Sequence, residues 1–89
     1  MKAVITVTGK DKVGIIAFVS AKCQEYGANI VDISQTVMKD YFAMIMLVEL
    51  DGLNAEFSHF AQVMSKAGGE HGVDIRVMHE DIFNSMHRI

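Results

Sequence analysis

Two segments of the sequence carry apolar side chains on both faces of a strand, and this feature constrains the fold more than any other. Residues 2–8 are β-branched at Val4, Ile5, Thr6, Val7 and Thr8. Residues 41–50 have one apolar set at Phe42, Met44, Met46, Val48 and Leu50, and another at Ala43, Ile45 and Leu47. A strand that is apolar on both faces belongs in the middle of a sheet. We therefore predict that both segments are central strands.

The other segments complete the order β-α-β-β-α-β. Apolar residues spaced three and four apart predict a helix from Val13, with Asp11 as its N-cap and Gly27 at its end. Residues 29–38 alternate as a second strand. We predict a second helix with Asn54 as its N-cap, and we expect it to end or fray at Gly68-Gly69. Its apolar stripe consists of Phe57, Phe60, Ala61, Met64 and Ala67. Residues 73–77 predict the last strand.

This order predicts an α+β fold of the ferredoxin-like βαββαβ type. Its four-stranded antiparallel sheet would have two helices on one face, and the first and third strands would be central. We expect one domain over residues 1–80 and an amphipathic C-terminal tail over residues 81–89. The tail has apolar residues at helical spacing but is too short to be stable alone, so it must dock on its own sheet or on a neighbour.

Charge and composition exclude several classes of function. Eight Lys and Arg against eleven Asp and Glu leave a net charge of −3 over 89 residues, which argues against direct binding to nucleic acid. The sequence contains no apolar run of about 18 residues and no signal-type start, so we expect no membrane span and a cytoplasmic protein. Its single cysteine, Cys23, lies in the apolar stripe of the first helix and predicts a buried, inert thiol.

The sequence provides little for catalysis. The nucleophile motif G-x-S-x-G is absent, and the four histidines fall in no HExxH or Cys/His zinc spacing. His79, Glu80, Asp81 and His87 would converge if the tail were helical; the alternative is that they are ordinary surface residues. We therefore predict neither enzymatic activity nor a cofactor or metal.

The loop from Gly9 to Gly14 is the most informative segment. It begins like a phosphate-binding loop, but Ile15-Ile16 stand where Lys and Ser or Thr would be required. The start of a helix presents free amides and a positive dipole end, which could receive a small carboxylate such as that of an amino acid. Lys10 and Lys12 flank this loop and add positive charge. The alternative is a glycine turn with an aspartate cap.

Two short motifs resemble the ACT domain family: Gly9-x-Asp11-x-x-Gly14 after the first strand, and Tyr26-Gly27-Ala28-Asn29-Ile30 before the second. The resemblance covers residues 2–78 and is closest to small stand-alone ACT proteins similar to the regulator of the glycine cleavage system. It implies a homodimer or higher homo-oligomer with an amino-acid site at the interface. Site residues carried over by the resemblance are Gly9, Asp11, Val13, Gly14, Asn29 and Ile30, with Val13 standing where the family most often has proline. Lys10 and Lys12 join them from charge alone.

Three functions remain open at this point. The first is a regulatory protein that binds an amino acid or a similar ligand and alters a protein partner. The second is an oligomerising interaction module without a small ligand, suggested by Phe18 off the helix stripe and by apolar residues on the open face of the sheet. The third, an enzyme using the histidines, rests on the fold alone. We favour the first.

Overall fold

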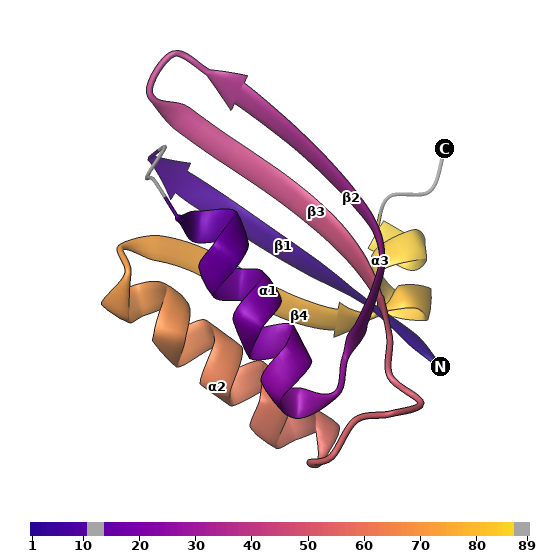
Figure 1. Cartoon of the computed structure of the whole chain (residues 1–89). Helices are drawn as coiled ribbons and strands as arrows, with labels where there is room; N and C mark the ends of the chain where they lie inside the picture. Colours follow the sequence, from indigo (N-terminus) through magenta and orange to yellow (C-terminus); the bar gives the residue numbers. More distant parts are fainter. Residues whose placement is uncertain (11–13, 87–89) are drawn as a thin grey trace.

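The computed structural model describes residues 1–10 and 14–86 and confirms the predicted order of elements (Figure 1). The elements are β1 (Lys2–Lys10), α1 (Ile15–Tyr26), β2 (Asn29–Met38), β3 (Tyr41–Glu49), α2 (Phe57–Glu70), β4 (Val73–His79) and α3 (Glu80–Met86).

The sheet has the strand order β2-β3-β1-β4, and every neighbouring pair is antiparallel. Strands β1 and β3 are central, as their two apolar faces predicted. Helices α1 and α2 lie together on one face of the sheet (Figure 1). The predicted ferredoxin-like architecture is confirmed. Strand β2 is an edge strand, with a register shift between Ile30 and Asp32.

The hydrophobic core lies between this face of the sheet and the two helices. Strand β3 contributes every second residue, because successive side chains of a strand point to opposite faces. The buried side chains include Ile5, Val7, Val19, Cys23, Met44, Met46, Val48, Phe60, Met64 and Ile75. Three of the seven methionines therefore pack in the core, where a flexible thioether fills irregular space.

The helix ends differ from the prediction in three places. Helix α1 begins at Ile15 with Gly14 as its N-cap, so the predicted cap at Asp11 is wrong; Asp11 lies outside the described residues. The N-cap of α2 is Glu56, not Asn54. Instead, Asn54 binds the end of α1: its Nδ2 donates to the Glu25 carbonyl, and its backbone N–H donates to the Tyr26 carbonyl, both at 3.0 Å.

The third difference concerns the glycine pair in α2. The helix continues through Gly68 and Gly69 to Glu70. Gly68 is buried, and a Cβ added there would lie 2.7 Å from Cγ1 of Ile75 and 2.9 Å from the Val73 carbonyl oxygen. The glycine is therefore required for the close packing of α2 on β4, and it does not end the helix.

Phe18 is not the exposed residue that an interaction module would need. It is half-buried, packs against the core, and its ring stacks on the His71 ring with centroids 3.9 Å apart. The apolar stripe of α1 consists of Ile15, Val19 and Cys23, and the residue on its outer side is Ile16, with 38% of its surface exposed.

Helix α3 contacts β1 and β4, so the tail docks on its own sheet, one of the two options that its apolar spacing left open. The sequence-based boundary at residue 81 stays a prediction. His87 and Ile89 lie outside the described residues.

Candidate functional site

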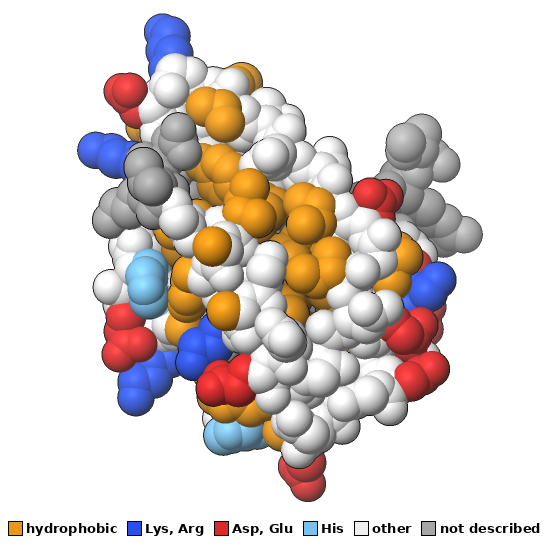
Figure 2. Space-filling view, viewed as in Figure 1, with side chains coloured by type: hydrophobic (Ala, Val, Ile, Leu, Met, Phe, Trp, Pro, Cys, Tyr) orange, Lys and Arg blue, Asp and Glu red, His pale blue; other side chains and the backbone are white. Residues whose placement is uncertain are grey.

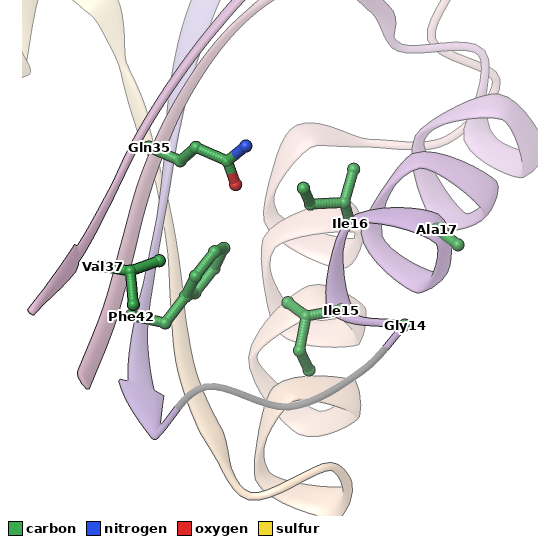
Figure 3. A pocket seen from close by; sticks show the side chains of 7 residues that line it. All are labelled: Gly14, Ile15, Ile16, Ala17, Gln35, Val37 and Phe42. Atoms are coloured by element: carbon green, nitrogen blue, oxygen red, sulfur yellow. The ribbon is translucent and has the colours of Figure 1, made fainter. Parts of the chain in front are cut away.

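A pocket of about 310 Å³ lies between the start of α1, the end of β2 and the start of β3. It is lined by Gly14, Ile15, Ile16, Ala17, Gln35, Val37 and Phe42. Figure 3 shows that Phe42 and Ile15 face each other at the base, while Gln35 and Ile16 extend toward each other from the two sides. On the helix side of the β2–β3 hairpin, Gln35 and Val37 of β2 stay exposed beside the start of α1.

The start of α1 supplies hydrogen-bond donors to this pocket. The first helical bond runs from the Phe18 N–H to the Gly14 carbonyl, at 2.9 Å. The backbone N–H groups of Ile15, Ile16 and Ala17 have no carbonyl one turn earlier within the helix. Such groups, together with the helix dipole, favour an anionic ligand at the helix start.

The two loop glycines have different structural roles. Gly14 has φ = 89°, a left-handed conformation that favours glycine, and a Cβ there would meet no atom of the described residues within 4 Å. Gly9 lies within β1, and a Cβ there would be 2.9 Å from Cγ1 of Val73. Gly14 therefore shapes the entrance of the pocket, whereas Gly9 is needed for the approach of β4.

The structure brings only some of the predicted site residues together. Gly14 lines the pocket, and Lys10 ends the strand that leads to it. Asp11, Lys12 and Val13 lie outside the described residues. Asn29 and Ile30 follow the other end of α1, and a helix of 12 residues spans about 18 Å. Within one chain, the first and second motifs are therefore at opposite ends of the helix.

Sequence reasoning missed Gln35, Val37 and Phe42. Gln35 is the one side chain among the described lining residues that carries hydrogen-bonding groups. A signal was present, because the alternation of residues 29–38 puts Gln35 between Ile33 and Val37 on a face that is otherwise apolar. An amide on such a face is informative about binding, since pockets combine apolar walls with a few polar groups.

The histidines do not gather into a metal site in the described part of the chain, where no group of three or more His, Cys, Asp or Glu side chains could hold an ion. His79 stacks on the Phe57 ring at 4.0 Å, and His71 on Phe18. The Cys23 side chain is fully buried, and this burial raises the pKa of its thiol to about 11. A thiol with so high a pKa is a poor nucleophile at neutral pH.

No helix within residues 1–10 and 14–86 is long and apolar enough to cross a membrane. Residues 2–78 match a family model described as ACT domain. A UPF0237 protein of Clostridium perfringens is 51% identical over 89 residues, which covers 100% of both chains. Another, from Methanocaldococcus jannaschii, is 48% identical over 88 residues, covering 99% of this chain and 98% of that one.

Solved structures agree with these sequence matches. An ACT domain protein from Streptococcus pneumoniae superposes with a TM-score of 0.82 at 44% identity, over 98% of each chain. The crystal structure of a putative glycine cleavage system transcriptional repressor shares the fold, with a TM-score of 0.74 at 24% identity over 85% of this chain and 43% of that one. The chain belongs to the ACT domain family.

Proposed function

We propose that this protein is a regulatory ACT protein that binds an amino acid in the pocket at the start of α1, works as a dimer, and alters a protein partner when the ligand binds. The observation that supports amino-acid binding is the composition of the pocket. The backbone N–H groups at the helix start suit the ligand's carboxylate, the Gln35 amide suits its amino group, and Ile15, Val37 and Phe42 suit an uncharged side chain.

The proposed dimer is supported by the β2 edge, by which we mean the outer side of β2 together with its exposed apolar residues. Within residues 1–10 and 14–86, strand β2 pairs with β3 alone, so its other side presents unpaired backbone groups that can bind another strand. Its side chains Val31 and Val37 are about half exposed. Figure 2, which looks onto the helix side of the sheet, shows hydrophobic side chains gathered in a continuous patch next to α1, a feature typical of association surfaces.

A dimer with its two-fold axis at this edge would also bring the first motif of one chain close to the second motif of the other. If the β2 strands of two copies pair antiparallel, the partner's β2 start lies beside the end of this chain's β2. Asn29 and Ile30 of one chain would then approach Gln35 and Val37 of the other, next to the start of α1. Both sequence motifs would thus contribute to one pocket, and ligand binding would depend on the dimer.

The test is a thermal-shift and calorimetry screen of the twenty amino acids. A ligand at 100 times its Kd adds about 2.7 kcal/mol, which for a domain of this size raises the Tm by roughly 10 °C or more. We expect Gln35→Leu to abolish this shift. The matched control Gln62→Leu changes an exposed glutamine of α2 and should leave the shift intact. The absence of any shift for all twenty amino acids would rule out amino-acid binding.

The dimer is tested separately by light scattering. Ile33→Lys puts a charge on the β2 edge without changing a residue of the pocket lining, and should give monomers, whereas Ile33→Val should stay dimeric. If Ile33→Lys kept its dimer mass, the β2 edge would not be the interface.

A further inference from the structure

Strand β2 begins with an irregularity that leaves one residue without a partner in the sheet. In the register with β3, the partner of Ile30 is Val48. The partner of Asp32 is Leu47, which directly precedes Val48. No residue of β3 is therefore left to pair with Val31. An extra residue of this kind is a β-bulge, which increases the local twist and redirects a side chain.

The bulge puts two consecutive side chains, those of Ile30 and Val31, on the same side of the sheet. Ile30 packs against the hydrophobic core, on the helix side. Gln35 lines the pocket on that side too, and every second residue of a strand shares a face. Alternation counted back from Gln35 therefore places Ile33 and Val31 on the helix side. Ile30 fills the core of its own chain, while Val31 beside it stays about half exposed.

In the proposed dimer, Val31 would face the pocket of the other chain. Ile33 lies midway between Asn29 and Val37, so an antiparallel pairing that brings these two together has its two-fold axis at Ile33. Two residues away from that axis, Val31 of one chain stands opposite the partner's Gln35. Side chains directly opposite each other in an antiparallel pair share a face, with Cβ atoms about 4.5–5.5 Å apart. Val31 would thus close the outer side of the pocket.

The pocket completed in this way suits an aliphatic side chain. Its base is closed by Ile15 and Phe42, which face each other and are both buried (Figure 3). Its walls are Ile16 and Val37 of one chain and Val31 of the other. The described lining residues carry no charge, so an ionised ligand side chain would lose its hydration without gaining a partner.

We propose that Val31 determines the specificity of the amino-acid site from the partner chain, and that the ligand has an aliphatic side chain, as in valine or leucine. This role rests on the proposed function, because it requires both the ligand and the β2-edge dimer. Each CH₂ group buried against these walls raises the affinity about 4-fold. Leucine should therefore bind roughly 100-fold more tightly than glycine, which has no side chain to bury.

The first experiment compares valine with threonine by calorimetry, because the two ligands have nearly the same shape and differ by one hydroxyl. The wild type should bind valine about 10–100-fold more tightly. Val31→Thr keeps the shape of the residue but makes it polar, and should reduce this ratio about 3-fold or more. The matched control Val63→Thr changes a half-buried valine of α2 outside the pocket lining and should leave the ratio unchanged. Light scattering verifies that each variant is a dimer.

The second experiment tests whether Val31 acts across the interface. Val31→Trp, which fills the pocket, and Gln35→Leu should each abolish valine binding. When the two variants are refolded together from urea, each heterodimer has one site with both residues intact and one site with both changed. Random pairing makes half of the dimers heterodimers, so calorimetry should recover about a quarter of the wild-type sites. No recovery would show that Val31 does not act from the partner chain.

The other outcomes separate this role from the proposed function. If none of the twenty amino acids binds the wild type, the proposed function fails, and the role of Val31 fails with it. If an amino acid binds but Val31→Thr leaves the ratio of valine to threonine affinity unchanged, the role of Val31 is overturned and the proposed function stands. Tighter binding of glycine, or of a charged amino acid, than of valine would overturn the aliphatic class. A monomeric wild type would overturn the action across the interface.

Discussion

The glycine pair of α2 offers a sharp test of how this fold is packed. Gly68 and Gly69 are neighbours in one helix, yet a Cβ on Gly68 would press on Ile75 and on the Val73 carbonyl, whereas a Cβ on Gly69 would meet nothing within 4 Å. Alanine at either position gains helix propensity, by about 0.5–1 kcal/mol. Only at position 68 must β4 or the helix move to make room.

Overpacking of this kind costs about 1–3 kcal/mol. After the propensity gain is subtracted, Gly68→Ala should lower the free energy of unfolding by about 0.5–2 kcal/mol. Gly69→Ala should raise it by about 0.5–1 kcal/mol. The two variants differ by one position, so their opposite signs can come only from the contact with β4.

Urea denaturation at a single protein concentration measures both effects, since association would otherwise change the apparent stability. With a urea slope of about 1–3 kcal/mol/M, a change of 1 kcal/mol moves the midpoint by roughly 0.3–1 M. A Gly68→Ala protein as stable as Gly69→Ala would refute the reasoning, because it would mean that α2 and β4 separate at no cost.

Three further predictions concern other parts of the chain. Gly27→Ala should lower the free energy of unfolding in urea by about 2 kcal/mol or more, because φ at Gly27 is 78° and the new Cβ would collide with the Gly52 carbonyl oxygen. Gly52→Ala should lower it less, and an equal loss of stability in the two variants would contradict this geometry. Asn54→Ala removes the hydrogen bond to the Glu25 carbonyl and should lower the free energy of unfolding by about 0.5–1.5 kcal/mol. No loss of stability would show that this hydrogen bond does not stabilise the protein. The native Cys23 thiol should react with a thiol reagent at pH 8 at least ~100-fold more slowly than in the urea-unfolded chain, and equal rates would show that it is accessible. The pKa of the Cys23 thiol is about 11 in the folded protein and 9.0 ordinarily, so between pH 9 and pH 11 the thiol loses its proton when the protein unfolds. The free energy of unfolding should therefore fall as pH rises from 9 to 11, and Cys23→Ala should reduce this fall.

The architecture could be predicted from the sequence because each element carries its own periodicity. Residues 2–8 and 41–50 are apolar on both faces, and this alone identifies two central strands among four. Cys23 lies in the core as predicted, because the apolar spacing of α1 does not depend on distant contacts, and Gly14, the last residue of the first loop, lines the pocket.

The ends of the helices could not be predicted in the same way. Gly68-Gly69 has the composition of a helix end, but packing against β4 selects glycine there for its missing side chain. Asn54 has the composition of an N-cap, and it caps the end of α1 instead. Local sequence preference is worth about 1 kcal/mol at such positions, so tertiary contacts easily override it.

The amino-acid sequence by itself determined the order of elements, the two central strands and the membership of the ACT family, since these depend on local pattern and short motifs. The tertiary structure decided which residues share a pocket. It placed Gln35 and Phe42, distant from the first loop in sequence, beside Gly14, and it separated Asn29 from that loop by the length of α1. Periodicity specifies which way a side chain points, whereas only the packing of the helices on the sheet specifies what that side chain meets.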